Sequence, residues 1–511
     1  MNAYPDSRWV GLKFTFEFLD VEAQEDATPA SSAEDELSQI GQTLDGGSDA
    51  TPPFISLEHN RWGLGQHFVP VPESIEGVTT GWVCSPLSNR VTTFASQPYL
   101  EFRFSEPHSS IGFTVVFEES TGEHALQFRV ETFNAGGTVV SSKTVENHSA
   151  TAAVELPTLD YTRVRFTFLK SSRPYSRVRI RSVLFGIIES YDADTVTQAT
   201  LEYRVDPIAE SLPSRECTVR IDNSSQRFNL INPNGIYAYL QQPQVFHVHM
   251  GAGAEKDSID YVSMGEFYFA KASAEDSSLT AEITAYDWFY WLEKGVFKNT
   301  QTGSWTLGEA ITAIFANAGI NCEVDISEDA AATPLLKVTQ EMTNREALRL
   351  ALQASCCTAY YDRRNVLKVL DLSLTEPVDV LDEDNMAAPP GVTMENAVNT
   401  VELTARNSAT GNETVYTASN VPDDELVQVK SVSNDMVDPS MGQQVAEWIL
   451  AWSQGRLTYS TQERGNPETE LGDSVQICDY FGVNRTAIIT GQVFKFDGGL
   501  SVESKAITNG T

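Results

Sequence analysis

Basic residues are scarce in this 511-residue sequence, in which 35 Lys and Arg stand against 70 Asp and Glu and give a formal net charge of −35. Proteins that hold nucleic-acid phosphates need clustered Lys and Arg, so this balance argues against nucleic-acid binding as the function. The same scarcity leaves no polybasic segment for an anionic membrane surface. Plain solubility is the other reading of so acidic a chain.

Motifs of catalysis are missing as well. The sequence has no Gly-x-Ser-x-Gly turn, no Walker loop and no His-Glu-x-x-His helix. All seven histidines lie at or before His249, which leaves the second half of the chain without a histidine for acid–base chemistry. Carboxylate pairs remain an open alternative, because some of 70 acidic residues must lie near one another. We expect no enzyme, no catalytic residue and no cofactor.

Signals for export and membrane insertion are absent too. Residues 1–14 lack a basic region followed by an apolar core, and no apolar run is long enough to span a bilayer. We therefore expect a protein made in the cytoplasm, without a membrane span. No cysteine pair has Cys-x-x-Cys spacing, and all six cysteines are predicted to be buried thiols, not disulfides or zinc ligands. They are Cys84, Cys217, Cys322, Cys356, Cys357 and Cys478.

Short strands dominate the first part of the chain. Apolar residues alternate with polar ones over 9–18, which predicts a half-buried strand. Further strands without intervening helices predict a β-sandwich. They are expected at 99–104, 112–117, 125–133, 139–145, 152–156, 164–169 and 178–187. Residues 20–50 contain no Lys or Arg and few apolar side chains, so they are predicted to form a flexible acidic loop.

The stretch from Ser258 to Leu292 predicts a strand, a turn and a second strand that ends in an aromatic cluster. Strict alternation would place Tyr261, Phe267 and Phe269 on one face, with Val262 and Met264 on the other. Large aromatic side chains at the end of a strand usually pack against a barrel mouth or a neighbouring domain.

Helical periodicity appears first in the second half. Leu307, Ala310, Ile311, Ile314 and Phe315 form one stripe, with Ser304 or Thr306 as the N-cap and Gly319 as the stop. A second helix is expected from Asn344 as its cap, and a hairpin is expected to turn at 362–365. Together these elements predict a small α+β module. A later helix over 439–456 has an apolar face formed by Val445, Trp448, Ile449 and Trp452.

Three groups of residues could bind a ligand, and each has a simpler structural explanation. Trp62, His67, Phe68 and Trp82 are the candidates for stacking on a sugar. His247 and His249 have the spacing of a metal pair on a strand, but no histidine follows them as a third ligand. Asp379, Asp382, Glu383 and Asp384 suggest calcium without the fixed spacing of an EF-hand loop. We therefore predict no metal site.

Several segments carry a resemblance to a known family. The stretches Val262-x-Met264-Gly265 and Ala285-x-Asp287 resemble the first barrel of siphophage tail hub proteins. Arg464-Gly-Asn-Pro467, Leu471-Gly-Asp473 and Phe494-x-Phe-Asp-Gly-Gly-Leu500 resemble the closing barrel of these baseplate hub proteins. Residues 55–64 and 174–187 resemble a galactose-binding-like jelly roll, although Gly63–Gly65 depart from its usual Leu-Asp-Gly.

The resemblance implies a mainly β fold with a small α+β module. The implied domains are a jelly-roll sandwich over 1–190, a first hub β-barrel over 191–300, the α+β module over 301–375, and a second hub β-barrel over 376–511 with an inserted helix at 439–456. The chain ends just after its last predicted strand, so no lysin domain is expected.

The resemblance also implies a function. A tail hub is a structural virion protein, a homotrimer at the tail tip that closes the distal end of the tail tube and opens for genome ejection. Its partners would be the distal tail protein, the tape measure protein and receptor-binding or tail fibre proteins, with DNA only in transit. The alternative is a carbohydrate-binding adhesin that uses the front sandwich to contact a host surface glycan.

Overall fold

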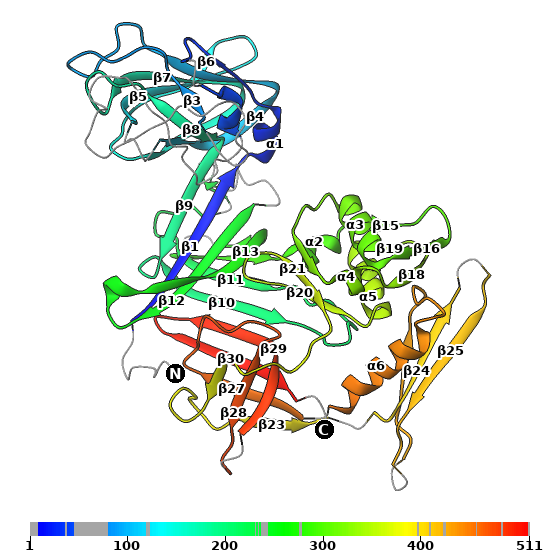
Figure 1. The fold of residues 1–511 in the computed structure, drawn as a ribbon. Coiled ribbons are helices and arrows are strands. Elements are labelled where there is room, and N and C mark those ends of the chain that lie inside the picture. The colour runs from blue at the N-terminus through cyan, green and yellow to red at the C-terminus, as the bar shows by residue number, and fades with distance from the viewer. Residues whose placement is uncertain are drawn as a thin grey trace, which may run out of the picture. The chain divides into compact units, whose positions relative to one another are not determined.

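The computed structural model describes residues 9–35, 38–44, 80–118, 123–229, 231–232, 235–236, 244–274, 278–395, 398–407, 410–422, 426–455, 457–481 and 484–508. These residues form two compact units. One unit comprises Phe16–Glu189 and Pro233–Gln244, and the other comprises Met1–Thr15, Ser190–Asn232 and Val245–Thr511. We call them the sandwich unit and the hub unit. The chain passes from one to the other within strands β1 (Trp9–Leu19) and β9 (Gly186–Asp192) (Figure 1).

The sandwich unit is built on one antiparallel sheet with strand order β3-β8-β4-β7-β5-β6, to which β2 adds by pairing with β4. Strands β4 and β7 are long, and their pairing with each other is irregular between Arg103 and Gly112. Phenylalanines from both layers fill the core. The elements are α1 (Val21–Asp26), β2 (Thr28–Ser31), η1 (Ile40–Leu44), β3 (Trp82–Val83), β4 (Tyr99–Phe117), β5 (Ala125–Phe133), β6 (Val139–Glu146), β7 (Thr151–Ser171) and β8 (Arg179–Leu184).

The prediction of a flexible loop over 20–50 is wrong for the described residues 20–35 and 38–44. Asp20 caps helix α1 by accepting a hydrogen bond from the Ala23 N–H at 2.8 Å, and Ala23 is fully buried. Gln24 donates to the Leu44 carbonyl at 2.8 Å and to the Val183 carbonyl at 3.2 Å. Long-range hydrogen bonds therefore order a segment whose low apolar content suggested disorder.

A single large sheet organises the hub unit, with strand order β23-β27-β30-β29-β10-β11-β14-β13-β12-β1-β9 and with β28 pairing with β29 and β22. Its strands come from both predicted barrel regions, which the antiparallel pairing of β10 with β29 joins. They are β10 (Val196–Arg204), β11 (Glu216–Asp222), β12 (Val245–Gly253), β13 (Asp260–Ser273), β14 (Thr280–Tyr286), β22 (Asp379–Leu381), β23 (Gly391–Met394), β27 (Leu457–Glu463), β28 (Ser474–Cys478), β29 (Asn484–Phe496) and β30 (Leu500–Ile507), with the short helix η3 (Lys256–Ser258) between β12 and β13.

Strand β13 breaks the strict alternation that its sequence predicted. The pairing with β12 slips between Gly265 and Ser263, so that Met264 and Phe267 are both fully buried. Tyr261 is partly exposed, and the Lys13 ammonium lies 3.9 Å from the centre of its ring. The expected shared face of Tyr261 and Phe267 is therefore wrong, because a bulge reverses the side-chain direction between them.

The α+β module follows this sheet in the chain and has the predicted helices. Thr306 and Glu309 form a capping box at the start of α3, and Gly319 ends that helix in a left-handed conformation. Thr343, not Asn344, caps α5. The elements are α2 (Trp288–Leu292), β15 (Val296–Phe297), β16 (Gly303–Thr306), α3 (Leu307–Ala318), β17 (Val324–Ile326), α4 (Glu328–Ala331), β18 (Pro334–Lys337), β19 (Met342–Thr343), α5 (Asn344–Ala354), β20 (Thr358–Tyr361) and β21 (Leu367–Leu370).

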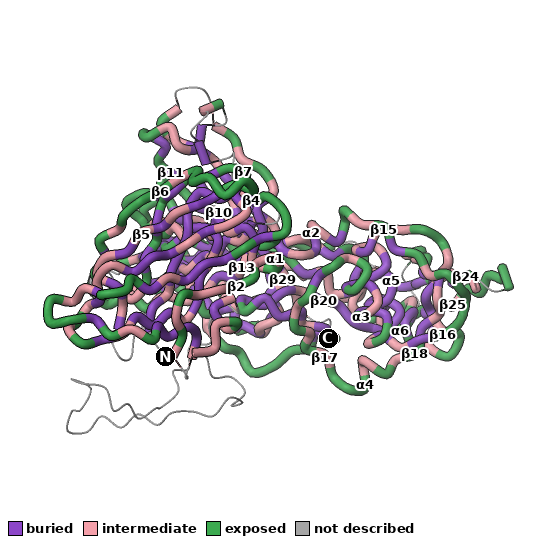
Figure 2. Tube along the Cα trace, turned by 90° about the horizontal axis from the view of Figure 1, so that it is seen from above, coloured by how far each residue is buried: buried purple, intermediate pink, exposed green. Residues whose placement is uncertain are grey.

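The region predicted as a second barrel contains a separate insertion. Strands β24 (Thr400–Arg406), β25 (Glu413–Ser419) and β26 (Val429–Ser433) form their own sheet, on which helix α6 (Gly442–Gln454) lies. Their buried side chains belong to the same core as those of α3 and α5. Figure 2 shows buried stretches along the strands and helices of this region. The predicted helix therefore packs against a three-stranded sheet outside the large sheet.

Candidate functional site

The hub unit contains a buried arginine at the point where three distant segments meet. Arg215 precedes β11 and is 1% exposed. Its backbone N–H donates to Asp287 Oδ2 at 3.0 Å, and its Nε lies 3.4 Å from the same oxygen. Its Nη1 donates to the Asp362 carbonyl at 2.8 Å, and its Nη2 donates to Asn365 Oδ1 at 3.0 Å. One side chain thus connects the strands of the large sheet to the β20–β21 turn.

Asp287 has two structural roles at this position. Its Oδ1 accepts the Phe289 N–H at 3.1 Å and so caps helix α2, while its Oδ2 faces Arg215. Burial raises the pKa of Asp287, and the nearby Arg215 charge and backbone hydrogen bonds work against that rise. Removing two charges from water is costly unless every polar group is satisfied. Asp287 Oδ2, the Asp362 carbonyl and Asn365 Oδ1 accept hydrogen bonds from Arg215 and fix its geometry.

Gly265 gives Arg215 the space it occupies. A Cβ at position 265 would lie 2.7 Å from Arg215 Nη1, and the backbone there has φ of +110°. Both features require glycine. On the same strand, Tyr268 accepts a hydrogen bond from Asn365 Nδ2 at 2.9 Å, which holds the β20–β21 turn from a second direction.

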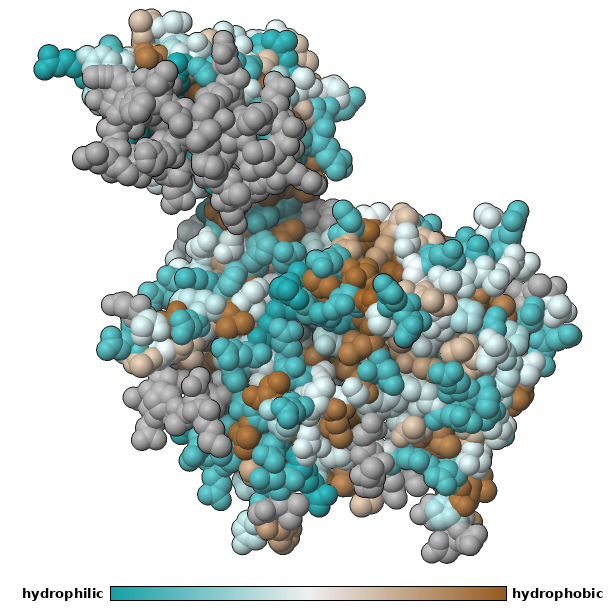
Figure 3. Space-filling view, in the orientation of Figure 1, coloured by the Kyte–Doolittle hydropathy of each residue, from teal (hydrophilic) through white to brown (hydrophobic). Residues whose placement is uncertain are grey.

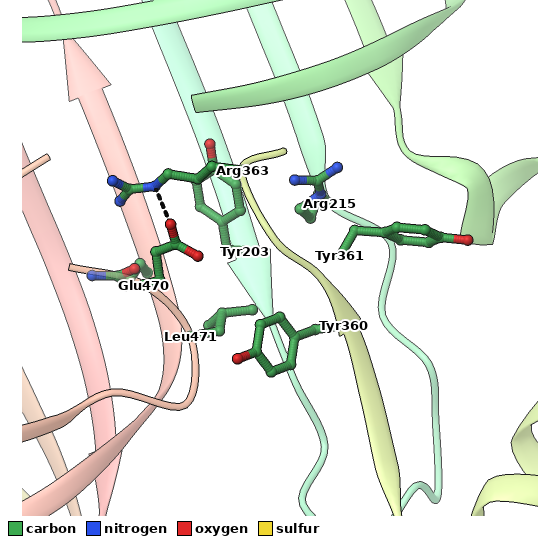
Figure 4. Close-up of a pocket in the computed structure, with 8 residues that line it drawn as sticks. Tyr203, Arg215, Tyr360, Tyr361, Arg363, Glu470 and Leu471 are labelled. Carbon is green, nitrogen blue, oxygen red and sulfur yellow. Dashed lines mark ion pairs between the residues drawn. The ribbon is translucent and has the colours of Figure 1, made fainter. Parts of the chain in front are cut away.

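A second arginine, Arg363, lies in the β20–β21 turn and contacts the loop that precedes β28. Arg363 is 8% exposed, its Nε lies 3.7 Å from Glu470 Oε1, and its Nη2 donates to the Thr469 carbonyl (Figure 4). Burial lowers the pKa of Arg363 and raises that of Glu470. Arg363 Nη1 has no hydrogen-bond partner among the described residues. Arg215, Asp287, Asp362, Arg363, Asn365 and Glu470 together form what we call the arginine junction.

The hydrogen bonds of the junction position the backbone. Both guanidinium groups donate to main-chain carbonyls, and Tyr203 donates its hydroxyl to the Met264 carbonyl at 2.7 Å beside them. Figure 4 shows Tyr203, Tyr360 and Tyr361 around the two arginines, on strands β10 and β20. The contacts of the arginine junction hold the large sheet, the α+β module and the loop around Glu470 in one arrangement.

Only one of the four predicted sugar-binding residues, Trp82, lies among the described residues. Trp62, His67 and Phe68 lie outside the described residues. Trp82 is fully buried in the sandwich core, with its ring centre 5.5 Å from that of Phe168, so this candidate is not available for stacking on a sugar. Its position on β3 points it into the core.

The two histidines of β12 share a face, as predicted, with buried Val248 between them. His247 Nδ1 lies 3.8 Å from Glu266 Oε1. Burial lowers the pKa of His249, and the neighbouring His247 and Lys13 charges act in the same direction. Nowhere in the described ranges do three or more His, Cys, Asp or Glu side chains gather in a way that could hold a metal ion.

The acidic residues between β21 and β23 support turns. Asp379 Oδ2 accepts the Asn466 side-chain amide at 2.9 Å, and Asp382 Oδ1 accepts the Asp384 N–H at 2.9 Å.

The six cysteines are free thiols, as predicted, but only four are buried, because Cys322 and Cys478 are partly exposed.

The sequence did not reveal the junction, although it contained part of the signal. Gly265 and Asp287 stood in the segments that resemble tail hub proteins, and Glu470 adjoins Leu471-Gly-Asp473. No local pattern marked Arg215, whose partner Asp287 is 72 positions away and whose partner Asn365 is 150 away. Buried pairs of charged residues that lie far apart in the sequence can be located only once the fold is known.

Across the part of the chain that the structure describes, no helix is long and apolar enough to cross a membrane. Figure 3 shows hydrophilic residues mixed with small apolar groups on the visible face of the hub unit. Among the described residues, Tyr480 and Phe481, which follow β28, are the most exposed large apolar side chains, at 89% and 85%.

No family model matches the sequence, and no curated protein matches it. Solved structures do match. A tail protein from Neisseria meningitidis MC58 has a TM-score of 0.47 and 15% identity, over 63% of this chain and 94% of that chain. The 43 kDa tail protein of prophage MuSo2 from Shewanella oneidensis has a TM-score of 0.43 and 16% identity, over 62% and 93%. A prophage tail protein from Listeria monocytogenes EGD-e has a TM-score of 0.40 and 14% identity, over 62% and 91%. These three structures are described as tail proteins. The mainly β fold predicted from the sequence is confirmed.

Proposed function

We propose that this chain is a structural hub protein of a phage tail, located in the virion at the tail tip. In this role a homotrimer closes the distal end of the tail tube and opens for DNA ejection. It contacts the distal tail protein, the tape measure protein and receptor-binding or fibre proteins. The chain has no catalytic role in this proposal.

The observation that carries the proposal is where the motif residues lie. Gly265 and Asp287, from the segment that resembles the first hub barrel, both contact Arg215. Glu470, which adjoins the Leu471-Gly-Asp473 motif of the segment that resembles the closing barrel, pairs with Arg363. The resemblance therefore rests on residues that hold the three hub modules together, and a hub needs such a rigid connection to transmit load between ring and tip.

A free sheet edge supports the trimer. Strand β23 ends the large sheet and pairs only with β27 among the described strands. All four of its residues are exposed, including Val392 at 53% and Met394 at 64%. Unpaired edges with exposed apolar side chains are covered by neighbours in stable assemblies. In this proposal β23 lies at the contact between copies.

The acidity supports the part of the proposal that concerns DNA. Three copies of a chain with net charge −35 around a tube place negative charge near the passing phosphates. A basic lining would hold the duplex, whereas an acidic wall repels it at distances below about 8 Å at physiological salt. We propose that the surfaces facing the tube axis are net negative.

The test is to locate the chain and count its copies. Gold-labelled antibodies against the chain should decorate the distal tail end of the phage particles that carry its gene. Mass photometry should show trimers of the purified chain, alone or with the distal tail protein. Label on the capsid, or monomers under both conditions, would refute the proposal.

A further inference from the structure

The sandwich unit carries a cluster of arginines on one outer sheet face, although the chain as a whole is strongly acidic. Phe102, Val130 and Val164 point into the core and are fully buried. Their neighbours along β4, β5 and β7 therefore point to the opposite face. That face contains four arginines and two glutamates, which we call the arginine face. They are Arg103, Arg129, Arg163, Arg165, Glu101 and Glu131.

Strand pairing places these residues side by side. Glu101 lies opposite Arg165, and Arg103 lies opposite Arg163, in the pairing of β4 with β7. Arg165 lies opposite Glu131 in the pairing of β7 with β5. The cluster is therefore contiguous across three neighbouring strands, even though its members come from sequence positions far apart.

Glu101 organises the cluster from beneath. It is only 1% exposed, and it contacts Arg103 at 2.9 Å, Arg165 at 2.5 Å and Arg163 at 3.9 Å. Burial acts to raise the pKa of Glu101, but the three arginines outweigh it and the pKa is lowered. One buried carboxylate thus faces three guanidinium groups and cannot use all their donors, since each guanidinium has five.

Aromatic rings fix the orientation of two of these arginines. The Arg163 guanidinium lies 4.0 Å from the centre of the Phe133 ring, and that of Arg165 lies 4.3 Å from the centre of the Tyr99 ring. Stacked guanidinium groups lose little further freedom when they bind a planar or tetrahedral anion. Side-chain exposures of 64% for Arg103, 40% for Arg129, 26% for Arg163 and 29% for Arg165 leave them accessible.

The border of the face carries hydroxyl groups, together with Glu146 and Lys170, which lie opposite Gln127 at one end. Ser142 and Thr144 of β6 lie opposite Glu131 and Arg129, and Thr28 of β2 lies opposite Arg103. Protein–protein interfaces usually have an apolar, charge-poor centre. Here the centre is charged, and the Phe133 ring is 8% exposed beneath Arg163. A hydrated chain with both hydroxyls and anionic groups fits this arrangement better than another protein surface.

We infer that the arginine face binds an acidic polysaccharide, whose carboxylate or phosphate groups pair with Arg103, Arg129, Arg163 and Arg165 and whose hydroxyls contact the flanking Ser and Thr side chains. Four guanidinium groups against two carboxylates leave two positive charges for the ligand. This inference does not depend on the tail role, and it concerns residues other than the sugar candidates predicted from the sequence.

The test measures binding of the full chain to polygalacturonate and to poly(glycerol phosphate), with neutral dextran and oligo(dT) as comparisons. We expect both acidic glycans to bind, and the binding to weaken as salt rises. Arg103→Gln with Arg129→Gln should weaken binding by about a hundredfold, since each lost charge-assisted hydrogen bond corresponds to roughly tenfold. Both residues are well exposed, and Arg165 still pairs with Glu101, so the fold should persist, as a thermal melt will check.

The matched control is Arg204→Gln with Arg220→Gln in the hub unit. These two arginines are exposed by 63% and 46%, and each pairs with one glutamate, so the charge change is the same. This control should bind like the unmodified chain. A second variant, Arg163→Lys with Arg165→Lys, keeps the charge and removes the planar donors, and it should weaken binding several-fold.

Four results would overturn the inference. They are no salt-sensitive binding to either acidic glycan, dextran binding of equal strength, oligo(dT) binding that equals or exceeds that of both glycans, and equal loss in the control variant. Gold labelling at the tail tip would stand in any of these cases, so failure of this inference is distinguishable from failure of the proposed function.

Discussion

Replacing Arg215 by Met tests whether the arginine junction holds the hub unit together. Methionine fills a similar volume without charge, so the change removes the polar contacts and little packing. It leaves the Asp287 carboxylate fully buried without its cation, and it leaves the Asp362 carbonyl and Asn365 Oδ1 without their donor. Breaking one side of a buried pair costs about 3–5 kcal/mol. We expect a loss of this size in the free energy of unfolding.

Replacing Asp287 by Asn should cost less than replacing Arg215. Burial already raises the pKa of Asp287, which means that the fold disfavours its ionised form. An amide retains an oxygen for the Phe289 N–H, which Asp287 accepts at 3.1 Å. The double variant should cost less than the sum of the two single changes, because the second change removes a charge that the first left unpaired.

The pH dependence gives an independent check. In Arg215→Met, Asp287 loses the cation that opposes the rise of its pKa, so the folded state takes up a proton at higher pH than the unfolded chain does. Stability of this variant relative to the unmodified chain should therefore increase as pH falls through the folded-state pKa of Asp287. A loss that is constant from neutral to acidic pH would contradict the assignment of the cost to a buried carboxylate.

Differential scanning calorimetry of the full chain can measure the loss, because the two units provide an internal control. A loss of 3–5 kcal/mol should lower the hub transition by roughly 10 °C, and the sandwich transition should not move. Arg204→Gln, which breaks an exposed pair with Glu202, should cost less than about 1 kcal/mol. An unchanged hub transition in Arg215→Met would refute the reasoning.

Three further changes test other parts of the hub unit. Trp448→Ala with Trp452→Ala should lower the free energy of unfolding by about 2–4 kcal/mol, because both rings are half-buried and donate to Asp371 at 2.9 and 3.2 Å. A hub melting temperature equal to that of the unmodified chain would show that this face of α6 contributes nothing. Glu463→Gln should stabilise the hub or leave it unchanged at pH 7, because burial raises the pKa of Glu463. The unmodified chain should gain stability as pH falls through that pKa, and the variant should lack this gain, which urea titrations at several pH values will test. Gly465→Ala should cost about 1–3 kcal/mol, because φ is +86° and a Cβ would lie 2.6 Å from Val502 Cγ2; a melt within 1 °C of the unmodified chain would contradict it.

Local patterns predicted the local elements well. The stripe Leu307, Ala310, Ile311, Ile314 and Phe315 became the buried face of α3. Alternation over residues 9–18 became β1, with Phe14 and Phe16 each 1% exposed. Helix and strand periodicity are properties of neighbouring residues, so they can be read from the sequence.

Arrangements that depend on distant residues could not be predicted. The order of 20–44 comes from bonds such as that of Gln24 to the Val183 carbonyl, 159 positions away. Of the predicted apolar face of α6, Val445 and Ile449 are buried and Trp448 and Trp452 are partly buried against the same core, but the burial of Ala446 and Leu450 was not predicted. Which side of a helical stripe is deepest depends on the sheet it meets, and β24–β26 were assigned to a barrel.

The distribution of charge over the surface could not be predicted from the sequence either. A chain with 35 basic and 70 acidic residues suggests a surface without positive regions. The fold, however, gathers Arg103, Arg163 and Arg165 around a single buried Glu101. Total charge sets the long-range field of the molecule, whereas a bound ligand responds to the groups within about one Debye length, or 8 Å. In our two proposals, the tube wall repels DNA and one sheet face of the sandwich unit holds an acidic glycan, because each ligand responds to the charges close to it.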